Sequence, residues 1–351
     1  MQGAAFIPFC LAMAVIGGGL ALLVGLMAQP LGTALGLLDW PDLNGGRKRH
    51  ARVTPLVGGL ALTLAVVVAA FASRVMMPAG DVVAHDLGWL AFAVAMMFLI
   101  GASDDRFHLS PVLRLLAAMV VLVLVISSAP DVALAFLHFG GAERLLLLGS
   151  MGTVFTLLCL LGLLNAVNMA DGKDGLVLGL GLIWSAVLAA HLPPPYWPLL
   201  AATLAALLVL LWFNMTQRLF LGDGGSYALS ALLGLLAILT YNHGFENWRA
   251  DDVAVLFAVP VFDTVRLLVV RMSRGRSPFE GDRDHLHHHL HATLGWPRGL
   301  AVYLAMVAVP NAAALAMPGT GWFWLAISLG VYATVLRGTG HASTEAPDPA
   351  E

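Results

Sequence analysis

Long apolar stretches recur along almost the whole chain, and they restrict it to a fold whose solvent is largely lipid. A transmembrane helix needs about 20 mostly apolar residues, and such stretches here are separated only by short polar segments. Hydrophobic residues make up 59% of the 351 residues and charged residues only 11%, which is too apolar for an ordinary soluble domain. The sequence therefore predicts an all-α, polytopic integral membrane protein without a separate soluble domain.

Proline, glycine and charged residues divide the apolar sequence into eleven predicted membrane spans. They cover residues 4–28, 55–78, 84–102, 111–129, 146–168, 174–191, 197–213, 224–241, 252–272, 299–317 and 320–337. The first span has no basic start and is longer than the apolar core of a signal peptide, so we expect it to remain in the chain. The pattern predicts one transmembrane domain over residues 1–340 and a polar, disordered tail over residues 341–351.

Basic residues are concentrated on one side of the predicted membrane. When alternate loops are assigned to alternate sides, all but three of the 18 Lys and Arg residues fall on one side, the exceptions being Arg74, Arg144 and Arg249. Short loops rich in Lys and Arg remain in the cytoplasm during membrane insertion. We therefore expect that side to be cytoplasmic, with the N-terminus in the periplasm and the C-terminal tail in the cytoplasm.

Composition also narrows the range of partners. The formal net charge of -3 and the scattered basic residues give no footprint for nucleic acid, so no nucleic-acid partner is expected. Cys10 and Cys159 both lie inside apolar stretches, where packing is a more frequent role than a disulfide or a metal site.

Five polar clusters interrupt the apolar sequence, and all five fall in predicted cytoplasmic loops or at the cytoplasmic ends of spans. A transporter, which is the alternative class of protein, is expected to place its important polar groups near the bilayer midplane and to use both faces. The one-sided distribution therefore favours a membrane enzyme over a transporter.

The first two clusters carry opposite charges. The first is Arg-Lys-Arg-His at residues 47–50, followed by Thr-Pro-Leu-Val-Gly-Gly; this loop is either a topology signal or a binding site for a nucleotide diphosphate. The second is the adjacent pair Asp104 and Asp105 at the end of the third span. A helix cap needs only one carboxylate, whereas two adjacent carboxylates repel each other and favour a divalent cation or a cationic partner.

Oxygen-bearing side chains recur at helical spacing in the third and fourth clusters. Asn165 and Asn168 lie one turn apart at the inner end of the fifth span. Asp171 and Asp174 continue this spacing into a turn that contains glycine, so the four groups can converge on a pocket for a hard cation such as Mg²⁺. In the fourth cluster, Gly-Asp-Gly-Gly-Ser, Asp223 is either a helix cap or a metal ligand beside a helix N-terminus that favours anions.

The fifth cluster is a long loop rich in arginine and histidine. It covers residues 277–289 and includes Arg283, His285, His287 and His288. Such a run of histidines could bind Zn²⁺, but the chain offers no thiolate partner. Contact with phosphate groups is therefore the favoured role of this loop.

One acidic residue lies inside a predicted span. Asp263 is three residues before Arg266 in the ninth span. A charged group within the membrane is a candidate functional residue, but an ion pair across one helical turn accounts for it more simply.

Taken in order, the five clusters resemble the polyprenyl-phosphate N-acetylhexosamine-1-phosphate transferase superfamily, glycosyltransferase family 4. The resemblance spans residues 39–290. Within it, Arg-Lys-x-His with Pro-Leu-Val-Gly-Gly, and Ser-Pro-Phe with Asp-Arg-x-His-x-His-His, are most similar to bacterial undecaprenyl-phosphate N-acetylglucosamine-1-phosphate transferases. The chain departs from the family pattern at His108, where some members carry an acid, and at Lys173 and Gly224, where an apolar residue and alanine are common.

The resemblance implies ten or eleven membrane helices around a cytoplasmic catalytic cleft, with Mg²⁺ or Mn²⁺ as the cofactor. It implies transfer of an N-acetylhexosamine 1-phosphate from a UDP-N-acetylaminosugar to undecaprenyl phosphate, with release of UMP. By the family motifs, Asn168 and Asp223 contact the metal, and Asp104 and Asp105 serve metal affinity and activation of the lipid phosphate. The family motifs also place Asp171 and Asp174 in the nucleotide-sugar pocket, and Lys48, His285, His287 and His288 at phosphate groups or sugar.

These arguments predict a multi-pass enzyme of the bacterial inner membrane with a cytoplasmic active site in the 1–340 domain. Its candidate catalytic residues are Asp104, Asp105, Asp171, Asp174 and Asp223, and its candidate substrate-binding residues are Lys48, Asn165, Asn168, Arg283, His285, His287 and His288. The favoured sugar is N-acetylglucosamine, in lipopolysaccharide O-antigen or other cell-envelope polysaccharide synthesis. N-acetylgalactosamine, a deoxy-aminosugar and N-acetylmuramoyl-pentapeptide remain alternative donor groups, a lipid-linked sugar transporter remains the alternative class, and a homodimer is among the assemblies left open.

Overall fold

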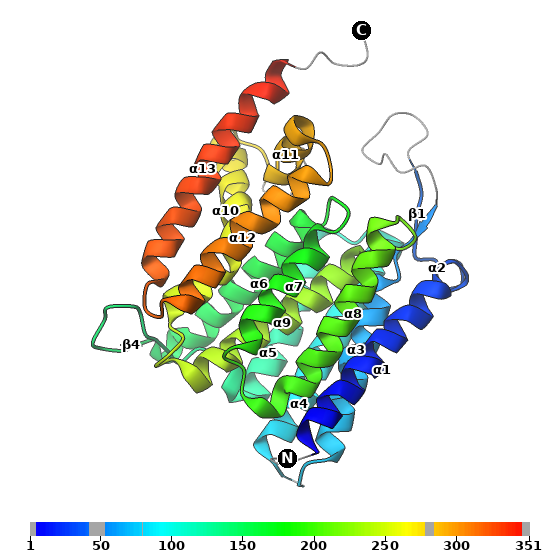
Figure 1. The fold of residues 1–351 in the computed structure, drawn as a ribbon, viewed down its shortest axis with the longest axis vertical. Helices are drawn as coiled ribbons and strands as arrows, with labels where there is room; N and C mark the ends of the chain where they lie inside the picture. The colour runs from blue at the N-terminus through cyan, green and yellow to red at the C-terminus, as the bar shows by residue number, and fades with distance from the viewer. Residues whose placement is uncertain (1–4, 42–52, 79, 278–283, 346–351) are drawn as a thin grey trace.

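The computed structural model describes residues 5–41, 53–78, 80–277 and 284–345 (Figure 1). Within these ranges, helices dominate the chain and the strands are four segments of two residues each. The all-α membrane class predicted from the apolar stretches is therefore confirmed.

The helices follow one another along the chain, and most connections are short, the longest being those from α2 to α3 and from α5 to α6. They are α1 (Phe6–Leu26), α2 (Ala28–Leu35), α3 (Gly58–Val75), α4 (Val82–Phe107), α5 (Pro111–Ser128), α6 (Gly152–Ala170), α7 (Leu176–Ala189), α8 (Trp197–Met215), α9 (Gly222–Gly244), α10 (Ala250–Ser273), α11 (Leu286–Leu294), α12 (Arg298–Ala316) and α13 (Gly321–Glu345). The strands form two antiparallel pairs, β1 (Leu38–Asp39) with β2 (Thr54–Pro55) and β3 (Phe136–Leu137) with β4 (Leu146–Leu147).

Nine helices in the described part of the chain are long and apolar enough to cross a membrane, namely α1, α3, α4, α5, α6, α8, α9, α10 and α12. The apolar helix α7 is shorter, with 14 residues, and α13 covers the last predicted span. Each predicted span thus coincides with a helix, although the number of eleven crossings stays a prediction. The short helices α2 and α11 were not predicted, because neither forms a long apolar stretch.

The helices present large apolar side chains outward. Ile7 is 70% exposed, Val15 75% and Phe71 68%, and many other leucines, valines and phenylalanines are also exposed. A water-soluble protein rarely exposes so much contiguous apolar surface. Lipid is the solvent that accounts for this surface.

Helices α4 and α13 extend furthest beyond the predicted spans. α4 continues to Phe107, so the aspartate pair lies inside its last turn and not after its end. The helix stops there because His108 adopts a left-handed conformation, with φ of 51°. α13 continues to Glu345, beyond the last predicted span; the division into a 1–340 domain and a 341–351 tail stays a prediction.

Helix α9 forms the centre of the molecule. Its apolar window is entirely buried, and it packs against α3, α4 and α6. Two glycines allow the closest approaches: a Cβ on Gly59 would lie 2.3 Å from the backbone nitrogen of Gly225, and a Cβ on Gly101 would lie 2.3 Å from the carbonyl oxygen of Asp223. Because any side chain at these two positions would push the helices apart, the glycines set the position of the first turn of α9.

A second group of helices lies beside this centre. α10, α12 and α13 pack against one another, and α11 contacts α12 and α13. Figure 1 shows these helices, coloured yellow to red, on one side of the bundle, and α10 also contacts α6. A large cavity lies where α6, α9 and α10 meet.

Candidate active site

Asp105 joins the end of α4 to the beginning of α9. Its Oδ1 accepts a hydrogen bond from the backbone nitrogen of Asp223 at 3.1 Å, and its Oδ2 accepts one from the backbone nitrogen of Gly224 at 3.2 Å. The first backbone N–H groups of a helix have no partner within the helix, so Asp105 caps α9. The predicted second and fourth clusters therefore meet in space.

Asp104 and Asp223 share one cationic partner, Arg114, near the start of α5. Nη1 of Arg114 bonds to Oδ2 of Asp104 and lies 3.5 Å from Oδ2 of Asp223. Asp104 is buried, so this arginine compensates a carboxylate that water reaches poorly. Arg114 was not predicted as a site residue; the signal that pointed to it is a cation in the first turn of a span that follows an aspartate pair.

The inner end of α6 contributes amide groups to the same place. Nδ2 of Asn168 donates to Oδ1 of Asp223 at 2.8 Å and approaches the hydroxyl of Ser226 at 3.2 Å. Asn165 lies one turn earlier and faces the cavity, while its Nδ2 donates to the carbonyl of Leu161. The third and fourth clusters thus meet at Asp223, whereas the convergence predicted within the third cluster holds for Asn165, Asn168 and Asp171 and not for Asp174.

The turn after α6 separates the two predicted aspartates. Asp171 lines the cavity, and burial, together with repulsion from Asp105 and Asp174, raises its pKa from 3.8 to about 7. Asp174 is not among the described residues that line the cavity. Its Oδ2 accepts a hydrogen bond from Nε2 of Gln217 at 2.8 Å, and its carbonyl accepts one from Nε1 of Trp296 at 2.9 Å. Asp174 therefore ties this turn to neighbouring loops in the structure.

The histidine cluster forms one wall of the cavity. His285 precedes α11, His287 and His288 lie in its first turn, and all three line the cavity. The rings of His285 and His287 are stacked, with centroids 5.4 Å apart and an interplanar angle of 13°. Burial, followed by the proximity of His288, His285 and Lys173, lowers the pKa of His287 well below its ordinary value. Burial therefore favours the neutral form of the His287 ring.

The close fit of His287 depends on a glycine. A Cβ at Gly172 would lie 2.7 Å from Nε2 of His287, and this buried nitrogen has no hydrogen-bond partner among the described residues. A buried polar atom without a partner is costly unless a ligand or water completes it. The site between Gly172 and the histidines is therefore suited to a polar ligand.

Two predicted residues, Lys48 and Arg283, lie outside the described residues. The paired strands β1 and β2 flank the segment that carries Lys48, and hydrogen bonds attach β2 to the loop that precedes Asp223. The backbone nitrogen of Phe220 donates to the carbonyl of Pro55 at 2.9 Å, and that of Gly58 donates to the carbonyl of Phe220 at 3.0 Å. The Pro-Leu-Val-Gly-Gly string thus packs directly before α9.

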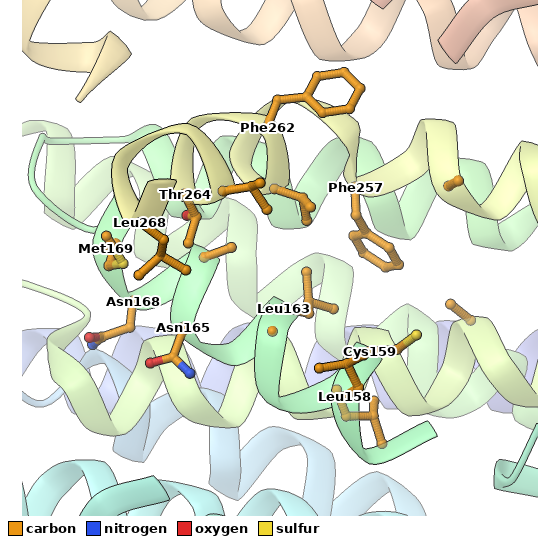
Figure 2. A pocket seen from close by; sticks show the side chains of 18 of the residues that line it. Leu158, Cys159, Leu163, Asn165, Asn168, Met169, Phe257, Phe262, Thr264 and Leu268 are labelled. Carbon is orange, nitrogen blue, oxygen red and sulfur yellow. The ribbon is translucent and has the colours of Figure 1, made fainter. Parts of the chain in front are cut away.

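The cavity has a volume of about 1210 Å³ and combines a polar end with a long apolar region. Figure 2 shows Asn165 and Asn168 at one end, and Leu158, Cys159 and Phe257 towards the other. The polar end is completed by other residues of the site, which are Arg114, Asp171, Asp223, Arg271, His285, His287 and His288. Arg271 is buried, at 3% exposure, and was likewise not predicted as a site residue.

The apolar region follows three helices through the membrane. Phe155 and Asp171, both on its wall, are separated by 16 residues of α6 and its end, which corresponds to about 24 Å along a helix. On α10, the lining residues extend from Ala250 to Arg271. The cavity therefore reaches from the carboxylates across most of the helical bundle.

The donor chemistry of the polar end fits a hard divalent cation. Asp104, Asp105, Asp171 and Asp223 lie close enough to repel one another, and Arg114 offsets only part of this charge. In the part of the chain that the structure describes, no three His, Cys, Asp or Glu side chains are grouped so as to hold a metal alone. Mg²⁺ usually takes one or two protein carboxylates and completes its shell with water and substrate phosphates.

Comparison with known proteins identifies relatives over most of the chain. Residues 87–241 match the model of glycosyl transferase family 4. The chain is 31% identical over 276 residues to the undecaprenyl-phosphate alpha-N-acetylglucosaminyl 1-phosphate transferase of Yersinia pestis, covering 75% of this chain and 71% of the relative. The protein of the same name from Escherichia coli (strain K12) is 30% identical over 273 residues, covering 74% and 71%. A probable undecaprenyl-phosphate N-acetylglucosaminyl 1-phosphate transferase of Bacillus subtilis (strain 168) is 25% identical over 276 residues, covering 77% and 74%.

Proposed function

Because the chain belongs to glycosyl transferase family 4, we propose that it transfers N-acetylglucosamine 1-phosphate from a UDP-sugar to undecaprenyl phosphate, giving the lipid diphosphate-sugar and UMP. The single observation that carries the proposal is the cavity, which joins a cluster of carboxylates, amides and histidines to a long apolar region. A reaction between a polar nucleotide-sugar and a prenyl lipid requires both environments to meet at one phosphate.

The apolar region accounts for the lipid substrate. Its walls are formed by α6, α9 and α10 and include Leu158, Leu163, Phe257 and Leu268. Burial of apolar surface contributes roughly 25 cal/mol per Å², so a prenyl chain along this wall binds without any specific polar contact. Its phosphate then lies at the carboxylate end of the cavity, beside Arg114.

Asn168 and Asp223 are the proposed holders of Mg²⁺ or Mn²⁺, since the amide and the carboxylate lie together at the polar end. When bound, the cation neutralises negative charge on the diphosphate. Asp105 fixes the first turn of α9, and therefore the position of Asp223, through its two hydrogen bonds to the helix N-terminus.

The remaining residues bind and orient the two phosphates. Arg114, which Asp104 holds in place, binds the lipid phosphate so that one of its oxygens attacks the phosphorus bearing the sugar, in line with the departing UMP. Phosphoryl transfer depends mainly on such positioning and on charge stabilisation. Asp171, Asn165, His285, His287 and His288 line the pocket proposed for the UDP-sugar, with Asp174 holding the turn that carries Asp171. Lys48 and Arg283 are proposed contacts to phosphate.

The enzyme is proposed to lie in the bacterial inner membrane with its active site in the cytoplasm, its N-terminus in the periplasm and its C-terminus in the cytoplasm. The concentration of basic residues on the side of the carboxylates supports this orientation. The product is then a lipid-linked aminosugar that starts a cell-envelope polysaccharide, such as lipopolysaccharide O-antigen.

Release of UMP by the purified protein tests the proposal. The protein is incubated with undecaprenyl phosphate, Mg²⁺ and a panel of UDP-sugars, and we expect UDP-N-acetylglucosamine to be the best donor and UDP-N-acetylmuramoyl-pentapeptide to be rejected. Asp223→Asn is the matched variant. We expect its turnover to be at least about a hundredfold lower, because stabilisation by the cation is worth several kcal/mol. Absence of lipid-dependent UMP release from every donor contradicts the proposal, and efficient use of the pentapeptide donor contradicts the assigned sugar.

A further inference from the structure

Asp263, a buried residue of α10, binds the beginning of α11, the helix that carries His287 and His288. Oδ2 of Asp263 lies 2.9 Å from Nδ1 of His285. The same carboxylate accepts hydrogen bonds from the backbone nitrogen of Leu286 at 3.2 Å and from the hydroxyl of Tyr332 at 2.8 Å. Since α11 begins at Leu286 and Tyr332 belongs to α13, Asp263 connects three helices at the edge of the cavity.

The groups around Asp263 determine which nitrogen of His285 carries the proton. Besides Leu286 and Tyr332, Nη2 of Arg266 lies 3.2 Å from Oδ1 of Asp263, which confirms the ion pair expected from the sequence. A carboxylate surrounded by donors and a guanidinium is an ionised acceptor, so the hydrogen of the shared bond belongs to Nδ1 of His285. In a neutral imidazole, a proton on Nδ1 leaves a lone pair on Nε2.

The other nitrogen of His285 is available to a ligand of the cavity. His285 lines the cavity, and its Nε2 has no hydrogen-bond partner in the described ranges. An acceptor at this position suits an N–H or O–H group of a ligand. The orientation of this acceptor depends on Asp263, which does not itself line the cavity.

We propose that Asp263 is a positioning residue, which fixes the tautomer and direction of His285 so that Nε2 accepts a hydrogen bond from the UDP-sugar. This inference rests on the proposed function for the identity of the ligand. The tautomer of His285 that the proposal requires does not depend on which ligand binds. Fixing a histidine through its second nitrogen is a general way of holding it in a productive orientation.

A second aspartate–histidine pair, Asp284 with His289 of α11, can be compared with the pair of Asp263 and His285. Nε2 of His289 lies 2.7 Å from Oδ1 of Asp284, and Nη1 of Arg266 lies 2.8 Å from Oδ2 of Asp284. His289 is buried and is not among the described residues that line the cavity. This pair anchors α11 to α10 without presenting a nitrogen to the ligand, so Asp284→Asn is a control for anchoring alone.

Solid-state NMR of the full chain in proteoliposomes, with ¹⁵N-labelled histidine and assignment by His285→Gln, reads the tautomer directly. In the wild type we expect neutral His285 to carry its proton on Nδ1. In Asp263→Asn, the amide oxygen keeps the bonds from Leu286 and Tyr332 and the amide nitrogen turns to His285, so the proton moves to Nε2. A wild-type neutral ring protonated on Nε2 overturns the inference, whether or not the protein transfers sugar.

Kinetics supply the second readout. We expect Asp263→Asn to lower kcat/KM for the UDP-sugar about tenfold to a hundredfold, the range found when partners that orient a functional histidine are removed. Asp284→Asn should change it less than about threefold. If Asp263→Asn does not fold, Asp263→Glu retains the charge opposite Arg266 but displaces the carboxylate, and it should keep the melting temperature while losing kcat/KM.

Equal losses in the Asp263 and Asp284 variants would assign Asp263 a purely anchoring role and overturn the inference. Absence of transfer by the wild type would instead contradict the proposed function, and the NMR result would still decide the tautomer. The two failures are therefore distinguishable.

Discussion

The substitution Gly101→Ala tests how the carboxylates are placed. A Cβ at Gly101 would lie 2.3 Å from the carbonyl oxygen of Asp223 and 2.5 Å from the backbone nitrogen of Gly224. Ordinary van der Waals contact begins near 3.4 Å, so the start of α9 must move by about 1 Å relative to α4. This movement stretches both hydrogen bonds from α9 to Asp105.

The displacement should affect catalysis more than folding. Overpacking costs about 1–3 kcal/mol, and replacing a helical glycine by alanine recovers about 1 kcal/mol, so the net loss of stability is at most about 2 kcal/mol. A displacement of 1 Å at reacting groups lowers the rate about a hundredfold. We therefore expect Gly101→Ala to remain folded in detergent, with a slightly lower melting temperature, and to release UMP about a hundredfold more slowly.

Gly19→Ala in α1 is the matched control. It is the same substitution within an apolar helix, but nothing lies within 4 Å of the added Cβ. Its melting temperature and turnover should equal those of the wild type or slightly exceed them. Wild-type turnover by Gly101→Ala would refute the argument that the contact between α4 and α9 sets the position of Asp223.

The remaining predictions concern the cavity, its charge and its orientation. Cys159 is exposed on the cavity wall, so in a Cys10→Ser background N-ethylmaleimide should lower turnover, and undecaprenyl phosphate should protect against this loss. Lack of protection would contradict the lipid site. Because the pKa of Asp171 rises from 3.8 to about 7 on folding, the metal-free protein should lose thermal stability as pH rises between these values. Asp171→Asn should flatten this slope in melting scans, and an unchanged slope would assign it to other groups. In a cysteine-free background, a cysteine that replaces Glu143 should react with an impermeant maleimide in intact cells, and a cysteine that replaces Arg276 should not. The reverse pattern would show the opposite topology.

The helices and the grouping of polar side chains within one helical turn were predictable because both follow from short-range sequence patterns. Apolar length determines where a membrane helix forms, and each predicted span coincides with a helix of the structure. The spacing of Asn165 and Asn168 placed both amides on one face of α6, and both line the cavity. The suggested ion pair between Asp263 and Arg266 was likewise confirmed, since it spans one helical turn.

Partners distant in the sequence were not predictable from spacing. Arg114 and Asp223 are separated by 109 positions, and only the packing of α4, α5 and α9 brings them together. Asp174 continues the spacing of Asp171, but the chain leaves helical geometry at Asp171, and Asp174 turns towards Gln217 and not into the cavity. A periodic pattern loses its meaning where the helix that it assumes has ended.

The apolar part of the cavity was beyond sequence reasoning for a different physical reason. In a membrane protein, a leucine that faces lipid and a leucine that faces an internal groove are chemically equivalent, so hydropathy cannot separate them. Leu158 and Leu160 lie on the same helix, and both line the cavity, yet Leu158 is 68% exposed and Leu160 only 4%. The wall therefore changes gradually from interior to lipid-facing surface. A wall that reaches the lipid-facing surface at Leu158 is the expected route for a lipid chain, and it depends on how α6 packs against α10, which no pattern within either helix encodes.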